Sequence, residues 1–274
     1  FDGVTDGEYA RIPPNPDVGA ATEAKGILSM LSANGVIYFS TMDGGNDSTD
    51  WRGRVFELDP NTGAVKALGT TFATGHLPYA LAWHAGRLWV GTHRELVTSN
   101  GNIYYFRPGV DTAWTLDRTG TQGNYACLRS FRGELYAGTI DNSAVFGVLE
   151  KRDSLGAWTT PETGTGGTAR DYNGYTSMVV FSDSLYAGYW NNDTTAIGKI
   201  RKFDGTTWTT AYDGSGATAI NPASMVVYNS KIYVFGNTNA TVTLLVTSNG
   251  SSWTDRTANI SSKDSIPAFF AYQT

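Results

Sequence analysis

A unit of four short predicted strands recurs five times along this chain, and this repeat limits the fold more than any other sequence feature. An aromatic residue opens the second strand of each copy: Tyr38, Trp89, Tyr136, Tyr186 and Tyr233. Successive markers are 51, 47, 50 and 47 residues apart. Eight positions before each marker stands a large apolar residue: Met30, Leu81, Leu128, Met178 and Met225. We therefore expect a tandem array of one structural unit.

The fourth copy shows the unit most clearly. Runs of β-branched and aromatic residues, separated by turn residues, predict strands at Ser177–Phe181, Leu185–Tyr189, Lys199–Phe203 and from Trp208 onward. No apolar period of about 3.6 residues is present there, so a helix is not expected. The outermost strand begins with Trp-Thr in four copies, at Trp114, Trp158, Trp208 and Trp253. Four strands in a repeat of about 40–50 residues are typical of one blade of a β-propeller.

We predict an all-β fold: a six-bladed β-propeller of four-stranded antiparallel blades, forming a single domain over residues 1–274. Five blades are expected at about 26–72, 77–123, 124–171, 174–220 and 221–265. The sixth blade is expected from residues 1–13 plus 266–274, so that both termini close the ring and leave few exposed sheet edges.

The alignment of the two ends supports this sixth blade. Pro267–Tyr272 aligns on the inner strand Ala223–Tyr228, and Phe1–Gly3 aligns on Phe203–Gly205. By comparison with the repeat, the blade lacks about 20 residues and is incomplete. We expect that residues before Phe1 are not included in the sequence.

Composition and charge narrow the classes of function. The net charge of −5 gives no basic surface of the kind that binds nucleic acid, and no apolar run approaches membrane-spanning length. We therefore expect no nucleic-acid partner and no membrane insertion. Cys127 is the single cysteine, which excludes an intrachain disulfide, and it is expected to pack as a small inner-strand residue.

Unusual side chains are concentrated in one set of loops. In a propeller, the loop after each second strand and the loop that enters the next blade emerge on the same face, which we call the loop face. Its candidate binding residues are His76, His93, Arg94, Arg170, Tyr172, Trp190, Asn192 and Asp193. The opposite face, the turn face, carries short turns such as Ala85–Gly86 and Arg132–Gly133 that are suited to connection only. Because binding residues concentrate in loops on a rigid scaffold, the ligand is expected on the loop face.

Trp190, Asn192 and Asp193 are typical of a sugar site. An aromatic ring stacks on the apolar face of a sugar, while amide and carboxylate groups bond its hydroxyls. The alternative is that Trp190 packs between blades, and the sequence leaves both readings open.

Two weaker patterns concern metal ions. Asp43, Asn46, Asp47 and Asp50 lie in one loop and offer oxygen ligands to Ca²⁺, although their spacing matches no EF-hand. Acidic surface turns are common, so a protein without a cofactor is the first expectation and Ca²⁺ the alternative. His76, His93 and Glu95 could approach each other on the loop face, but a zinc site needs three or four ligands in fixed geometry.

Two inner-strand positions depart from the repeat. Arg129 stands where the other copies have Leu31, Ala82, Val179 and Val226. A charge at such a position must pair, reach the central channel or line a ligand site, and we expect an ion pair before an anion contact. His84 stands in a column with Phe131 and Phe181 and is expected to be a packed core residue.

The turns Phe203-Asp204-Gly205-Thr206-Thr207-Trp208-Thr209 and Ser248-Asn249-Gly250-Ser251-Ser252-Trp253-Thr254 carry a resemblance. They look like those of Asp-box and kelch-like propeller repeats, which are found in sialidase-like proteins, secreted bacterial proteins and phage tail proteins. The Asp-box pattern has one more spacer residue, and the Gly-Gly pair of kelch repeats is missing here. A sialidase would bring three arginines to the centre, whereas only Arg129 projects from an inner strand. The resemblance therefore implies a propeller fold and no particular activity.

Three functions follow as hypotheses. The first is a non-enzymatic binding or adhesion module of an extracellular or virion surface, with a glycan or surface receptor as partner. The second is a structural subunit of a phage tail or surface filament that contacts other protein subunits. The third is a glycoside hydrolase or lyase, in which two carboxylates would lie about 5–10 Å apart; the candidates are Asp43, Asp141, Asp171 and Asp193.

Overall fold

The structure, a computed structural model, describes residues 24–43, 52–73, 75–94, 100–121, 123–140, 147–163, 173–191, 198–214, 220–238 and 241–259. Five repeats of four strands fill these ranges. Repeat 1 holds β1 (Ala24–Ala33), β2 (Val36–Asp43), β3 (Val55–Leu58) and β4 (Val65–Leu68). Repeat 2 holds β5 (His76–His84), β6 (Arg87–Arg94), β7 (Asn102–Phe106) and β8 (Thr115–Thr119). Repeat 3 holds β9 (Asn124–Phe131), β10 (Glu134–Ile140), β11 (Val148–Arg152) and β12 (Trp158–Thr163). Repeat 4 holds β13 (Gly174–Phe181), β14 (Ser184–Trp190), β15 (Lys199–Phe203) and β16 (Trp208–Asp213). Repeat 5 holds β17 (Asn221–Tyr228), β18 (Lys231–Thr238), β19 (Thr241–Thr247) and β20 (Thr254–Asp255).

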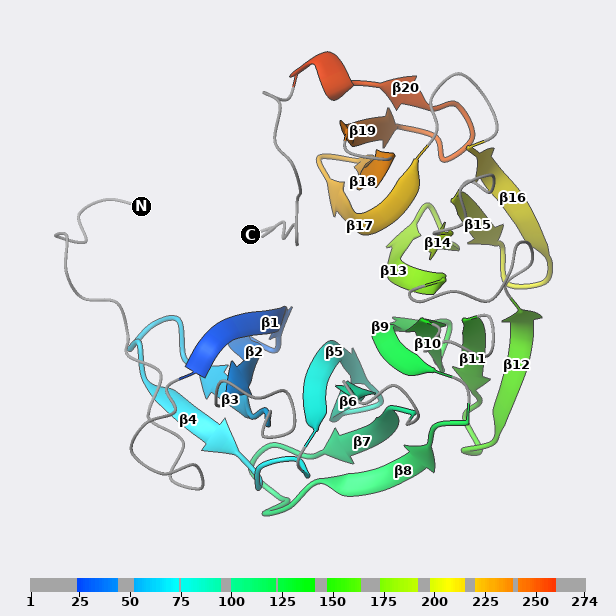
Figure 1. The fold of residues 1–274 in the computed structure, drawn as a ribbon. Coiled ribbons are helices and arrows are strands. Elements are labelled where there is room, and N and C mark those ends of the chain that lie inside the picture. Colours follow the sequence, from blue (N-terminus) through cyan, green and yellow to red (C-terminus); the bar gives the residue numbers. More distant parts are fainter. Residues whose placement is uncertain are drawn as a thin grey trace, which may run out of the picture.

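Strands in each repeat pair antiparallel in chain order. Repeats 1, 2 and 5 are separate four-stranded sheets, while a single bridge between Ile140 and Gly174 joins repeats 3 and 4 into an eight-stranded sheet. The first strands, β1, β5, β9, β13 and β17, lie innermost around a common centre (Figure 1). The chain is therefore all-β with curled antiparallel sheets, an arrangement consistent with a β-propeller. Among the described residues, no helix has the length and apolar character to cross a membrane.

The strands predicted for the fourth repeat are confirmed. β15 and the start of β16 agree with the prediction, and β13 and β14 are each longer than predicted. The outer strands begin at Trp158 and Trp208, and one residue after Trp114 and Trp253. The segments predicted for a sixth blade, 1–13 and 266–274, lie outside the described residues.

Two-residue turns join the first and second strands of each repeat. Both turn residues have positive φ angles, as in Ala85 (49°) and Gly86 (73°), or Ser182 (45°) and Asp183 (54°). This conformation matches the twist of paired strands and gives a tight hairpin. These hairpins make the connections on the turn face short.

The core lies between repeats rather than inside any one sheet. Four clusters of buried apolar side chains each combine residues of two neighbouring repeats. In the cluster between repeats 3 and 4, Phe131 and Phe203 meet with ring centroids 6.2 Å apart, and Trp208 stacks on Phe203 at 4.9 Å. Cys127 is buried in the same cluster, which confirms its predicted packing role, and burial raises its thiol pKa to about 12.

Two equivalent ion pairs also tie neighbouring repeats together, with their charges exchanged. Between repeats 2 and 3, Arg118 of β8 donates Nε to Glu150 of β11 at 2.9 Å, and Tyr125 donates its hydroxyl to the same carboxylate at 2.6 Å. Between repeats 3 and 4, Glu162 of β12 accepts from Arg201 of β15 at 2.9 Å, and Tyr175 donates to Glu162 at 3.4 Å.

Strand register shows that these two ion pairs occupy the same place in the repeat. Glu150 lies opposite Ala137 of its second strand, and Arg201 lies opposite Ala187, the equivalent residue. The inner-strand position of Tyr125 and Tyr175 is Pro78 in repeat 2 and Pro222 in repeat 5. The tyrosine is thus present only where there is a carboxylate to bond.

Candidate functional site

The structure describes four of the eight predicted binding residues: His76, His93, Arg94 and Trp190. The other four, Arg170, Tyr172, Asn192 and Asp193, lie outside the described residues, as do Asn46, Asp47 and Asp50 of the predicted calcium loop. Asp43 ends β2, and the structure describes its strand but not its side chain. The calcium hypothesis therefore stays a prediction.

His76 and His93 do not form one cluster. On the paired strands β5 and β6, His76 lies opposite Arg94, and His93 lies opposite Leu77. Because neighbouring strand residues point to opposite sides of a sheet, the two imidazoles lie on opposite sides. Both residues lie near the loop face, but strand alternation separates their side chains. The possibility that they approach each other is therefore not supported. Glu95, the third candidate, lies outside the described residues.

Each histidine has its own surroundings. His76 is buried and its Nδ1 lies 3.1 Å from the Thr92 hydroxyl, while burial and the neighbouring Arg94 lower its pKa. His93 packs its ring against Tyr79, with centroids 5.5 Å apart, and burial lowers the pKa of His93 to about 4. Both imidazoles are therefore neutral at pH 7.

Arg94 links repeat 2 to repeat 3 through its backbone. Its N–H donates to the Asn124 side chain at 2.7 Å, and Asn124 donates to the Arg94 carbonyl at 3.2 Å. Asn191 and Asn221 repeat the first of these bonds, at 3.1 Å, between repeats 4 and 5. The Nε atom of Arg94 is buried and has no hydrogen-bond partner among the described residues. A buried donor without a partner is uncommon in a folded protein.

Trp190 ends β14 on the loop face, opposite Gly174. Its side chain is half-buried, and the Nε1 donor is buried with no acceptor among the described residues. Part of the indole therefore packs against the protein, which is one of the two alternatives that the sequence left open. Its Nε1 atom has no hydrogen-bond partner among the described residues.

A small hollow lies on the loop face between repeats 3 and 4. It has a volume of about 150 Å³ and is lined by Glu162, Thr163, Tyr175, Tyr189, Lys199, Arg201 and Thr210. Tyr175 and Tyr189 meet edge-on with centroids 5.1 Å apart, and Arg201 donates to the Thr210 hydroxyl. Lys199 pairs loosely with Asp213, at 3.8 Å, and both side chains are substantially exposed. We call this the loop-face hollow; it combines aromatic rings with several hydrogen-bonding groups.

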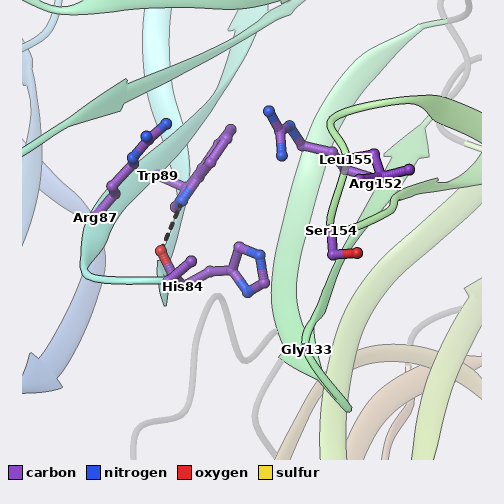
Figure 2. Close-up of a pocket in the computed structure, with 8 residues that line it drawn as sticks. His84, Arg87, Trp89, Gly133, Arg152, Ser154 and Leu155 are labelled. Atoms are coloured by element: carbon purple, nitrogen blue, oxygen red, sulfur yellow. Dashed lines mark hydrogen bonds between the residues drawn. The ribbon is translucent and has the colours of Figure 1, made fainter.

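A second pocket lies on the turn face, where no site was predicted. Figure 2 shows it between repeats 2 and 3, with His84 and Trp89 on one side and Arg152 and Ser154 on the other. Its volume is about 240 Å³, and its lining residues are His84, Ala85, Arg87, Trp89, Gly133, Arg152, Ser154 and Leu155. We call it the turn-face pocket. His84 is buried, as predicted, and bonds the Ser130 hydroxyl at 2.9 Å.

Arg129 has no carboxylate partner within the described ranges. Arg129 lies on β9 opposite Tyr136 of β10, and its side chain is half-buried. No hydrogen bond or ion pair joins it to another described residue. Burial lowers its pKa, with a small opposing effect of Cys127. The expected ion pair is thus not found in this part of the chain, and an anion contact stays a prediction.

The described residues offer no group of three His, Cys, Asp or Glu side chains close enough to hold a metal ion. Glu150 and Glu162 are each held by an arginine and a tyrosine.

Comparison with known proteins supports the fold and nothing more specific. No family model matches the chain, and no curated protein matches it in sequence. Structural similarity is widespread, since 455 chains of solved structures resemble it. One of them, described as "Structure of YjhT", superimposes with a TM-score of 0.58 at 11% identity, and the match covers 85% of this chain and 84% of the other. At this identity the likeness shows a shared all-β, propeller-like fold alone.

Proposed function

We propose that this chain is a non-enzymatic binding or adhesion module that acts at an extracellular or virion surface, with a glycan as its ligand. The observation that carries the proposal is the loop-face hollow at the end of β14. Tyr189 and Lys199 both line it and stand at the two ends of the segment that contains Asn192 and Asp193. Aromatic rings with nearby hydroxyl, ammonium and carboxylate groups are the side chains that sugars need.

The same proposal includes the finer fold. We infer six blades of four strands each, with a sixth blade formed by residues 1–13 and 266–274. The five described repeats, their common centre and the repeat alignment of the two ends support this inference (Figure 1). A closed ring would hold the loop face rigid, as a binding surface requires. Other protein subunits are the alternative partners.

Binding, structural and enzymatic roles can be separated with two assays. Labelled protein on a glycan array should bind a restricted set of glycans, and the same glycans in solution should remain intact after long incubation. Release of reducing ends or unsaturated products would establish a hydrolase or lyase instead. Absence of binding to every glycan, together with self-association into filaments or larger assemblies, would favour the structural subunit.

A further inference from the structure

The turn-face pocket lies at an interface where other residues replace both phenylalanines that meet between repeats 3 and 4. Between repeats 3 and 4, Phe131 ends the inner strand and Phe203 lies opposite Leu185, and the two rings fill the space between the repeats. In the neighbouring interface, His84 ends the inner strand and Arg152 lies opposite Leu135. Strand register therefore places His84 at the position of Phe131, and Arg152 at the position of Phe203.

The replacement changes both the volume and the charge of the interface. At the position of the two phenylalanines the side chains form a packed cluster, whereas the equivalent position with His84 and Arg152 holds a pocket of about 240 Å³. Its lining includes two arginines and a histidine and no carboxylate. An interior that exchanges apolar rings for cationic groups loses packing, which is costly unless the groups are used.

Protein contacts account for some of this charge but not for all of it. Arg152 is held by Asp117, with Nε–Oδ2 at 3.0 Å and Nη2–Oδ1 at 3.1 Å, and its guanidinium lies 5.0 Å from the Trp89 ring centroid. Arg87 stacks its guanidinium over Tyr105 at 4.4 Å and has no ion pair among the described residues. Stacking leaves the edge N–H groups of a guanidinium free to bond an anion.

Hydrogen bonds fix His84 in the same pocket. Its Nδ1 bonds Ser130, and its carbonyl accepts from Trp89 Nε1 at 3.1 Å, as Figure 2 shows. Burial, Arg152 and Arg87, in that order, lower its pKa, so the local potential is positive. The second imidazole nitrogen makes no hydrogen bond to a described residue, and Ser154 adds an exposed hydroxyl at the rim.

We propose that the turn-face pocket binds an oxyanion group, a carboxylate, sulfate or phosphate, between Arg87, Arg152 and His84. Guanidinium groups favour such anions because their planar N–H donors match the oxygens. The pocket is smaller than the roughly 300–1,000 Å³ typical of sites for drug-sized ligands. A free inorganic anion or the acidic group of a small sugar fits that volume. This site is separate from the loop-face hollow and does not depend on the proposed glycan site.

Sodium sulfate, titrated at constant ionic strength against sodium chloride, is the first probe. The imidazole proton resonances of the protein's three histidines report the location. Saturable movement of the His84 signal without movement of His76 or His93 is expected. Arg87→Gln should weaken sulfate binding about tenfold or more, because a charged hydrogen bond is lost. Arg132→Gln is the matched control: this arginine lies on the same face and is already paired with Asp183, so its loss should leave affinity within about twofold.

His84→Phe rebuilds the neighbouring interface and provides a second test. It should abolish sulfate binding by calorimetry while keeping or raising the melting temperature, since a ring fills the pocket as Phe131 does. Glucuronate compared with glucose then distinguishes the source of the anion: binding of glucuronate alone points to an acidic sugar, and binding of sulfate alone to an inorganic ion. The proposal is overturned if neither anion binds saturably, or if Arg87→Gln and His84→Phe bind sulfate as the wild-type protein does.

Discussion

At the scale of single residues, Arg129 is the position that most departs from its repeat. Its equivalents are apolar, and no described residue neutralises its charge. Replacing this half-buried, unpaired charge with an apolar side chain removes a desolvation cost. Arg129→Leu should therefore raise the free energy of unfolding by about 1 kcal/mol or more, measured by urea denaturation. A loss of stability would mean that Arg129 has a carboxylate partner after all.

His93 sets a pH dependence that can be measured at the same scale. Its folded-state pKa of about 4 lies below the ordinary value of 6.5, so the unfolded chain binds the proton more tightly. Stability is full above pH 6.5 and falls as the pH drops toward 4, by up to about 3 kcal/mol from this residue. His76 and His84 contribute in the same direction. His93→Gln should flatten this loss between pH 6.5 and 4; an unchanged slope would show that His93 is not responsible.

At the scale of elements, the ion pairs Arg118–Glu150 and Glu162–Arg201 allow a test of whether the two interfaces are equivalent. Arg118→Glu leaves Glu150, whose side chain is only 2% exposed, beside a like charge. This variant should lose about 3–5 kcal/mol of stability. The double variant Arg118→Glu/Glu150→Arg reproduces the order of charges found in Glu162 and Arg201 and should recover most of the loss.

A surface pair provides the control for this experiment. Arg107 and Asp111 form an ion pair in a turn, and the arginine side chain is half exposed. Arg107→Gln should leave the free energy of unfolding nearly unchanged, because an exposed ion pair is screened by solvent. If the double bridge variant is as unstable as Arg118→Glu alone, the two bridges are not interchangeable and the equivalence of the interfaces is wrong.

The strands of repeat 4 could be predicted from the sequence, whereas the turn-face pocket could not. Alternation of apolar residues, turn residues and the marker spacing predicted the strands of repeat 4 nearly to the residue, because short hairpins fix the register. The turn-face pocket was missed because its second key residue lies on a third strand. Arg152 follows its marker by 16 residues and Phe203 by 17, since the loop before the third strand varies, so no constant spacing aligns them. The sequence analysis also did not separate His76 from His93. Their loops emerge on the same face, but their side chains point to opposite sides of the sheet.

At the scale of the whole molecule, the proposed sixth blade predicts that the C-terminal segment is part of the ring. If residues 266–274 form an inner strand, deleting them should lower stability by several kcal/mol, because buried apolar surface is lost. The point variant Leu155→Ser serves as the control, because this side chain is 93% exposed. An unchanged melting temperature after the deletion would show that the tail is not part of the ring.

The central claim is that the loop face of this molecule binds a glycan, and one comparison on a glycan array tests it most directly. Trp190→Phe keeps an aromatic ring of the half-buried indole but removes the Nε1 donor that has no acceptor among the described residues. Relative to wild type, the account predicts a loss of about tenfold in affinity for every glycan bound, with the melting temperature nearly unchanged. Leu155→Ser, on the turn face, should bind as the wild-type protein does. Wild-type binding that survives Trp190→Phe and is lost in Leu155→Ser would contradict the account and move the glycan site to the opposite face.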